Sequence, residues 1–420
     1  MADISVPAGG LLTTSDGRPL KSALATAQQR ARRRAFLLVL PLLAFIVITF
    51  IIPIGQLMHQ AVYNDGFSAN MPRTTAWFVE NPPGTAPDDI AFEALALDLK
   101  DAAAARSVGV VGTRVNYEMS GTRSLFTSTA RGAARFEPPY REALLEADAK
   151  WADLNLWGTM RQVSDAYSAN FFLAALDMTR DVNGKIVPMP EDRQIYVSLF
   201  VKTFLLAGLI TFTCFLLGFP IAHLLATLPM KWSNLLMILV LLPFWTSLLV
   251  RTTSWMVLLQ QQGVVNNTMV ALGIISDDGR IQMIYNQMGT IIAMTHILLP
   301  FMILPLYSVM RPIPPTYVRA ARSLGATSWT AFRRVYLPQT LPGVGAGSLL
   351  VFILAVGYYI TPALVGGASG QLISNLIAFH MQSSLNWSLA SALAALLLGA
   401  VLVLYWIYDR LVGIDNLKLG

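Results

Sequence analysis

Long apolar runs alternate with short polar connections along most of the chain. Each run contains at least 23 residues, whereas about 20 apolar residues in a helix cross a hydrocarbon core roughly 30 Å thick. We therefore predict an all-α integral membrane protein with six transmembrane helices. The runs cover residues 36–58, 195–228, 235–259, 288–310, 342–365 and 389–411.

The first run has a competing interpretation as the core of a cleaved signal peptide. Such cores usually span about 7 to 15 residues and precede a small-x-small cleavage site. The run 36–58 is longer, and it lacks a small-x-small site at its end, where the segment from Ile54 to His59 is bulky. We favour an uncleaved first span, preceded by a flexible tail (residues 1–35) that ends in a cluster of four arginines.

A polar insert at residues 59–193 interrupts the pattern. It holds 18 of the 24 Asp and Glu residues, all between positions 61 and 193. Helical spacing predicts three helices in it, at about 89–106, 140–151 and 160–178. No catalytic constellation stands out, so we expect a small, solvated helical cap.

Basic residues in the short connections predict the orientation. With six spans, all the basic connections fall on one side, the cytoplasm. Both termini (1–35 and 413–420) are then cytoplasmic and the insert extracytoplasmic. The basic connections are the N-terminal tail, the turn at Met230–Lys231, the loop after Met310 and the C-terminal residues with Arg410 and Lys418.

Composition supports a lipid environment. The chain is 55% apolar and 13% charged, with a mean hydropathy of +0.54, whereas soluble domains carry about 25% charged residues. The net charge of +6 raises the possibility of a nucleic-acid partner. We expect none, because basic residues at the edges of apolar spans are explained by membrane topology.

The chain lacks the motifs of an enzyme or a metal protein. Cys214 is the single cysteine and the four histidines are scattered, which excludes an intrachain disulfide and a thiolate metal site. No phosphate-binding loop occurs. We therefore expect no catalytic residue, metal or cofactor in this chain, and any energy from ATP must come from a partner.

Residues 311–342 contain five arginines and no acid. Two stripes at helical spacing flank Gly325, where a glycine permits a turn with positive φ. A competing interpretation is an amphipathic element on anionic lipid, with its arginines at the headgroups. The first stripe is Tyr317, Ala320, Ala321 and Leu324, and the second is Trp329, Phe332, Val335 and Tyr336.

This segment resembles the E-A-A loop of ABC importer permeases. Arg319 stands where the family has glutamate, which leaves any contact of that carboxylate in question. The resemblance extends over about 195–411, and the motifs at 243–246, 299–301 and 361–367 are most similar to the spermidine/putrescine branch. The loop residues in register with the family pattern are Ala320, Ala321, Gly325, Phe332, Leu337 and Pro338.

The resemblance implies a type I permease core of five helices at 194–412 in the bacterial inner membrane. It also implies ATP-binding ABC subunits that carry ATP and Mg, a second permease subunit forming a heterodimer, and a periplasmic solute-binding protein. The region 322–329 would be the coupling helix, and the pore would carry a polyamine. The residues assigned to ATPase coupling are Arg319, Ala320, Ala321, Leu324, Gly325, Ala326, Trp329, Phe332, Leu337 and Pro338.

Arg251 is the one charge deep within a predicted span. An intramembrane charge is a functional-site hypothesis by default; the alternative is an anchor for carbonyls freed near Pro243, or a place at the outer rim. Neighbouring aromatic and hydroxyl side chains are further candidates to line a pathway, since aromatic faces attract ammonium groups, although tryptophan and tyrosine in spans are more often packing or interface residues. The pathway candidates are Trp245, Thr246, Arg251, Trp255, Tyr358, Tyr359 and Thr361.

Other functions remain open from the sequence. An importer of this type could carry opines, amino acids or another small organic solute instead of polyamines. A secondary transporter would need ionisable groups at the membrane midplane, and the span interiors lack acids. A membrane-anchored sensor or scaffold would bind its ligand with the insert.

Overall fold

The computed structural model describes residues 20–412, in two units that divide after His59. In the first unit, α1 (Leu20–Ile46), a π-helical turn (Val47–Ile51) and α2 (Ile52–Gln60) form one continuous helix. Its apolar side chains are almost all exposed, as a lipid-facing helix requires. The predicted flexible tail is wrong for residues 20–35, because the Ala, Gln and Arg found there are strong helix formers. Residues 1–19 and the predicted cytoplasmic C-terminus (413–420) lie outside the described residues.

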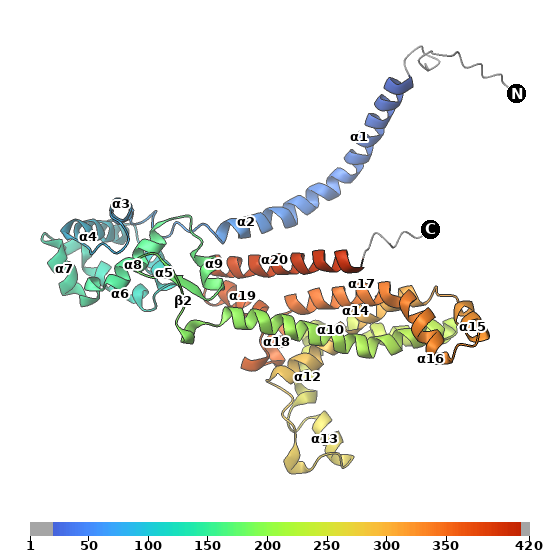
Figure 1. Cartoon of the computed structure of the whole chain (residues 1–420). Helices are drawn as coiled ribbons and strands as arrows, with labels where there is room; N and C mark the ends of the chain where they lie inside the picture. The colour runs from blue at the N-terminus through green and yellow to red at the C-terminus, as the bar shows by residue number, and fades with distance from the viewer. Residues whose placement is uncertain (1–19, 413–420) are drawn as a thin grey trace. The chain divides into compact units, whose positions relative to one another are not determined.

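The insert is a packed helical domain with its own core (Figure 1). Trp151 is fully buried and its indole N–H donates to Thr129 Oγ1 at 3.0 Å. The Trp157 indole N–H donates to the Trp151 carbonyl at 2.8 Å. The elements are α3 (Pro72–Glu80), α4 (Asp89–Ala104), α5 (Val108–Asn116), α6 (Thr122–Gly132), α7 (Tyr140–Ala147), α8 (Leu154–Ser164), α9 (Asn170–Ala175), and the antiparallel hairpin β1 (Met178–Arg180) and β2 (Ile186–Pro188).

Two of the predicted insert helices are present, although the one predicted at 140–151 ends at Ala147 because Asp148 is extended, and the third is not continuous. Helix α4 begins as predicted, with Asp88 accepting the Ala91 N–H at 2.9 Å as its N-cap. The predicted helix 160–178 is wrong, because α8 ends at Ser164 and residues 165–168 are not helical. There the Asn64 N–H donates to the Ala166 carbonyl and the Ser168 N–H to the Val62 carbonyl, both at 2.8 Å. This pairing is long-range, so helical spacing could not reveal it.

The remainder of the chain forms the span region. Within residues 20–412, five helices are long and apolar enough to cross a membrane, and a bent pair raises the number to six. These findings confirm the predicted all-α membrane fold. The elements are α10 (Tyr196–Thr227), α11 (Met230–Leu241), α12 (Leu248–Leu259), α13 (Val264–Ala271), α14 (Gln287–Met310), α15 (Pro315–Ser323), α16 (Ser328–Ala331), α17 (Leu337–Gly357), α18 (Ile360–Val365), α19 (Ile373–Gln382) and α20 (Trp387–Val412).

The bent pair stands where a single span was predicted at 235–259. The chain bends by 96° between Met230–Trp245 and Leu248–Ala271. A 3-10 turn (Leu242–Trp245) lies at the bend and contains Pro243. Proline lacks an N–H group and its ring clashes with the preceding helical turn, so it ends the helix.

Helices α10, α14 and α17 pack together and share one apolar core. Two glycines of α17 lie directly on α14, where a side chain would not fit. A Cβ at Gly343 would lie 3.1 Å from the Pro305 carbonyl oxygen, and one at Gly347 would lie 3.1 Å from the Met302 carbonyl oxygen. Both therefore serve close helix packing.

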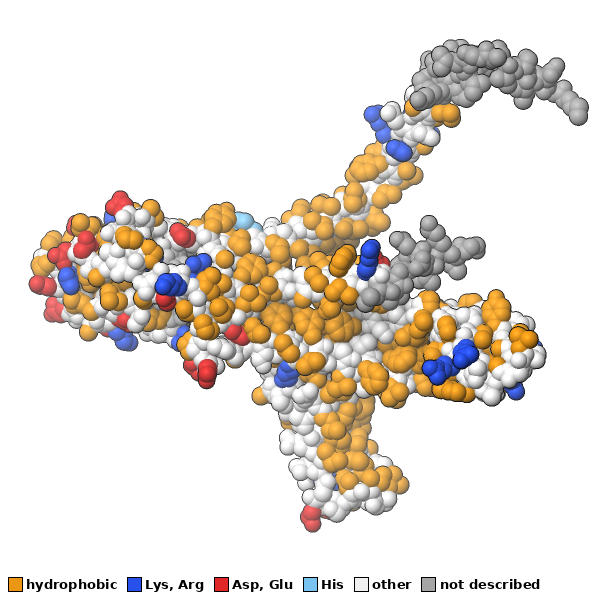
Figure 2. Space-filling view, in the orientation of Figure 1, with side chains coloured by type: hydrophobic (Ala, Val, Ile, Leu, Met, Phe, Trp, Pro, Cys, Tyr) orange, Lys and Arg blue, Asp and Glu red, His pale blue; other side chains and the backbone are white. Residues whose placement is uncertain are grey.

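The insert is tied to the beginnings of α10 and α20. Asp177 is buried, and its carboxylate accepts the N–H groups of Ile195, Tyr196 and Val197 at 2.8 to 3.1 Å. It thus caps the positive end of α10. The Tyr117 hydroxyl donates to the Leu385 carbonyl at 3.0 Å, just before α20. The acidic side chains visible in Figure 2 gather over the insert, whereas the span helices are mainly apolar.

Candidate functional site

The basic loop, residues 311–342, turns at Gly325. Helix α15 ends in a Schellman arrangement, in which the Gly325 N–H donates to the Arg322 carbonyl at 3.0 Å and the Ala326 N–H to the Ala321 carbonyl at 3.1 Å. Gly325 has φ +89°, and no atom lies within 4 Å of an added Cβ. The requirement for glycine is therefore conformational rather than steric. The predicted turn with positive φ at this residue is confirmed.

The tip of the basic loop exposes apolar side chains between cations. Leu324 is 89% exposed and Trp329 is 68% exposed. Arg319 and Arg322 are exposed beside them. Figure 1 places α15 and α16 together at one end of the α10–α14–α17 bundle. A large apolar tip of this kind suits a partner surface.

Arg311 fixes the start of the basic loop to α10. Its guanidinium donates to the carbonyls of Ala226 and Leu228 at 2.7 and 2.9 Å. These carbonyls lie at the C-terminal end of the helix, where they have no intrahelical partner and where a cation is favourable. Ser233 Oγ adds a bond to the Leu225 carbonyl at 2.8 Å. The loop and the end of α10 are therefore held as one structure.

Four of the pathway candidates lie around α12. The Trp255 indole N–H donates to His296 Nδ1 of α14 at 3.0 Å. The hydroxyls of Thr252 and Thr361 lie 3.1 Å apart and join α12 to α18. The charge of the Arg251 guanidinium acts on the side chains of His296 and Tyr358. Arg251, Trp255, Tyr358 and Thr361 thus share one region.

The other three candidates do not join this group. Trp245 is 88% exposed, and the Thr246 hydroxyl bonds back to the Pro243 carbonyl at 2.8 Å. Tyr359 is partly exposed, and its carbonyl accepts Asn375 Nδ2 at 2.7 Å. Among the described residues Arg251 makes no hydrogen bond to the carbonyls near Pro243, and its buried Nε is without a partner. The assignment of any of them to a pathway stays a prediction.

Comparison with known proteins decides the family. Residues 205–413 match the family described as binding-protein-dependent transport system inner membrane component. The chain is 36% identical over 224 residues to the spermidine/putrescine transport system permease protein PotB of Haemophilus influenzae, covering 53% of this chain and 78% of that protein. The chain belongs to this permease family. It is also 35% identical to PotB of Escherichia coli K12 over 52% of this chain and 80% of that protein, and 31% identical to the inner membrane permease protein YdcU of the same organism over 46% and 65%.

This permease is therefore an inner-membrane, multi-pass component of an ABC importer, of the spermidine/putrescine branch. Its family is one of transport proteins rather than enzymes. The matched region begins at residue 205, so the first span and the insert lie outside it. The basic loop and the α12 region lie within it.

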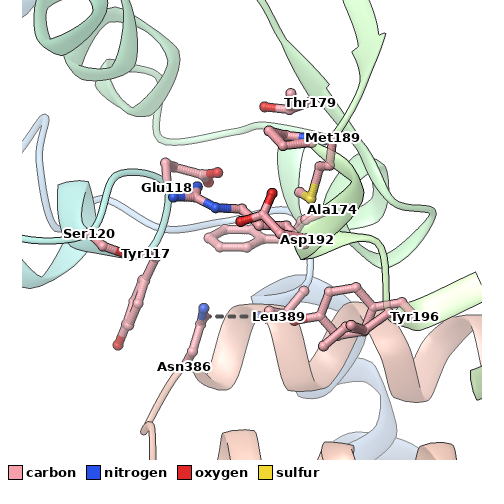
Figure 3. A pocket seen from close by; sticks show the side chains of 14 residues that line it. Tyr117, Glu118, Ser120, Ala174, Thr179, Met189, Asp192, Tyr196, Asn386 and Leu389 are labelled. Atoms are coloured by element: carbon pink, nitrogen blue, oxygen red, sulfur yellow. Dashed lines mark hydrogen bonds between the residues drawn. The ribbon is translucent and has the colours of Figure 1, made fainter.

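A cavity of about 340 Å³ lies where the insert meets the beginnings of α10 and α20 (Figure 3). Glu118 and Asp192 line it together with Arg193. Next to it, Arg114 lies 3.4 Å from Glu118 and 4.6 Å from the centre of the Phe171 ring. Burial lowers the pKa of the Arg114 guanidinium, and Glu118 opposes that shift. Since acids and cations are balanced here, the cavity favours neither charge.

Asp177 and the contact between His223 and Tyr336 were missed by the sequence analysis. Asp177 precedes the N–H groups that it caps by 18 to 20 residues, so no capping pattern marks it. His223 and Tyr336 are 113 residues apart, with His223 Nδ1 3.0 Å from the Tyr336 hydroxyl. For this contact the sequence marked only Tyr336, as a member of the stripe of the basic loop at helical spacing. Nothing in the sequence marked His223 as its partner.

Proposed function

We propose that this permease forms part of the pore through which a polyamine such as spermidine or putrescine enters the cell. The observation that carries this is the identity of 35 to 36% with two permeases named for that transport, each covered over more than three quarters of its length. A periplasmic solute-binding protein delivers the solute, and a second permease subunit completes the pore as a heterodimer. Both termini of this chain face the cytoplasm.

ATP-binding subunits dock on the basic loop and supply the energy. They hold the ATP and Mg, since this chain carries no phosphate-binding motif. The exposed Leu324 and Trp329 and the fixed turn at Gly325 support a docking role for residues 322–329. ATP binding closes the ATPase pair, which shifts a two-state pore toward its outward-facing form. Hydrolysis resets it.

The charge of the basic loop indicates the surface on which it docks. Arg319, Arg322, Arg333 and Arg334 are all exposed, and residues 311–342 contain no acid. Like charges brought together at an interface are costly. The ATPase groove therefore presents acidic or neutral side chains, with a carboxylate opposite Arg319.

A second candidate substrate is a solute with a carboxylate, such as an amino acid or an opine. Arg251 favours it, because this guanidinium lies near His296 and Tyr358 with a buried, unpaired Nε. A guanidinium binds carboxylates well and repels ammonium groups. The candidates differ in the expected effect of Arg251→Gln, which weakens carboxylate import and leaves polyamine import equal or faster.

Reconstitution tests the proposal. The two permeases, the ATPase and the binding protein are placed in vesicles, and uptake of labelled putrescine, spermidine and an amino acid is followed with and without ATP. We expect ATP-dependent polyamine uptake that requires the binding protein. Uptake without the ATPase would point to a secondary transporter, and uptake of the amino acid alone would support the second candidate.

A further inference from the structure

A column of stacked aromatic rings runs from the exposed tip of the basic loop into the core. The centres of the Trp329 and Phe332 rings lie 5.8 Å apart with 20° between their planes. Those of Phe332 and Tyr336 lie 5.7 Å apart with 26° between their planes. Trp329 is largely exposed, whereas Tyr336 is buried. The column thus connects a surface that a partner can touch with the interior.

The local backbone explains why the three rings align. Positions 329, 332 and 336 are separated by three and four residues, which places them on one face of a helix. The segment Phe332–Tyr336 is a π-helical turn between α16 and α17, and such turns occur frequently at functional sites. Because α16, this turn and α17 follow one another without a break, a displacement at Trp329 acts on the start of α17.

The inner end of the column meets α10 through a polar contact. The Tyr336 hydroxyl lies 3.0 Å from His223 Nδ1, and the two ring centres are 5.0 Å apart at 77°. His223 also lies edge-on to Phe332, and Phe219 of α10 does the same at 6.3 Å. A hydrogen bond in apolar surroundings is directional and stronger than one in water. It fixes the register of α17 against α10 more narrowly than ring packing alone.

We propose that Tyr336 and His223 are positioning residues that make α10 follow the movement of the basic loop. The inference rests on the proposed docking of an ATPase at that loop. Arg311 already ties the end of α10 to the loop, and Asp177 ties its beginning to the insert. Helix α10 therefore extends from the ATPase-facing end of the bundle to the insert. Its packing against α14, which carries His296, brings the movement to the α12 region.

The test compares Tyr336→Phe, which keeps the ring and removes the hydroxyl, with Tyr405→Phe, which removes an exposed hydroxyl from α20, outside the basic loop. In the full reconstituted transporter, ATP hydrolysis and solute uptake are measured together. We expect Tyr336→Phe to retain hydrolysis and ATPase copurification but to import about fivefold fewer solute molecules per ATP, the lower end of typical coupling between sites. Tyr405→Phe keeps the wild-type ratio.

A double-mutant cycle separates this link from general packing. His223→Leu removes the polar partner, and the double variant with Tyr336→Phe should be no worse than either single variant, because both break one contact. His223→Asn places an amide near the position of Nδ1. Compared with His223→Leu, it should restore part of the number of solute molecules imported per ATP. An unchanged ratio in Tyr336→Phe, additive losses in the cycle, or parallel losses of hydrolysis and uptake would each overturn the proposal.

A distance measurement keeps the proposal independent of the solute. Spin labels at the exposed positions Thr316 on α15 and Leu209 on α10 report whether loop and helix move together when a non-hydrolysable ATP analogue binds the complex. We expect a constant distance in the wild type and a changed one in Tyr336→Phe. A change in both would contradict the link. Failure of the wild type to import polyamine would overturn only the proposed substrate.

Discussion

Single residues determine how the two ends of α10 are held. Asp177 satisfies three N–H groups at its beginning, and Arg311 satisfies two carbonyls at its end. Both use charges that complement the helix dipole. Gly325 is likewise a single residue that determines a local structure, the turn of the basic loop. Its φ of +89° is one that other residues adopt only at a cost in free energy. Substitutions at Asp177 therefore test the stability of α10, and substitutions at Gly325 test the coupling of transport to the ATPase.

Gly325→Asp should uncouple transport without removing the permease from the membrane. Asn and Asp both tolerate the left-handed conformation, so Gly325→Asn is the matched control for backbone strain. We expect uptake by the Asp variant to fall by about tenfold, as when an interaction of ~1.4 kcal/mol is lost, with the Asn variant close to wild type. Uptake and membrane content are measured together. Normal uptake by Gly325→Asp would contradict the docking assignment.

Asp177→Ala should destabilise the start of α10. Loss of an N-cap costs about 0.5–2 kcal/mol, whereas asparagine is as good a cap as aspartate. We therefore expect a lower melting temperature in detergent for Asp177→Ala and a smaller change for Asp177→Asn. Equal losses in the two variants would show that the negative charge, rather than the cap geometry, is what matters.

Elements pack closely in the span region because α17 presents glycines to α14. The contact is set by backbone atoms of Pro305 and Met302, which cannot move aside as a side chain can. The bent pair is also explained by a local element, because Pro243 ends one helix and allows α12 to take a new direction. That bend brings Arg251 and Trp255 beside α14 and α18.

Gly347→Val should disturb the contact between α17 and α14. Overpacking of a close contact costs about 1–3 kcal/mol, so thermal stability in detergent should drop clearly. Gly399→Val is the control, because a Cβ at Gly399 of α20 has nothing within 4 Å. A similar loss in both variants would mean that valine harms these helices through its backbone preference alone.

At the scale of the whole molecule, the insert and the span region are linked rather than merely adjacent. Asp177 bonds to the beginning of α10, and Tyr117 bonds to Leu385 just before α20. The side-chain amide of Asn64 donates to Ser388 Oγ at the start of α20, at 3.1 Å. The insert is thus bonded directly to the beginning of α10 and to the start of α20. Its own core of buried tryptophans and phenylalanines keeps it a defined body.

Loosening the α20 link should be visible by hydrogen exchange. In the double variant Tyr117→Phe with Asn64→Ala, two bonds to the start of α20 are lost while the Asp177 cap remains. We expect faster exchange in residues 383–390 and unchanged exchange at the start of α10, measured by mass spectrometry. Tyr285→Phe removes an exposed hydroxyl of the span region and serves as control. Unchanged exchange near α20 would show that these two bonds are not needed to hold the start of α20.

The sequence by itself determined the features that depend on local pattern. The apolar runs predict the spans, because lipid requires about 20 apolar residues in succession. Gly325 predicts the loop turn, because few residues accept positive φ. Asp88 predicts the start of α4 through its place before a helical stripe.

Only the tertiary structure decided the features that join distant residues. The cap of α10 by Asp177, the contact of His223 with Tyr336 and the strand-like pairing that breaks the predicted helix 160–178 all link positions without a local pattern. The gathering of Arg251, Trp255, Tyr358 and Thr361 likewise depends on the 96° bend. The physical reason is that such contacts depend on where elements meet in space, which the periodicity of a single segment does not encode.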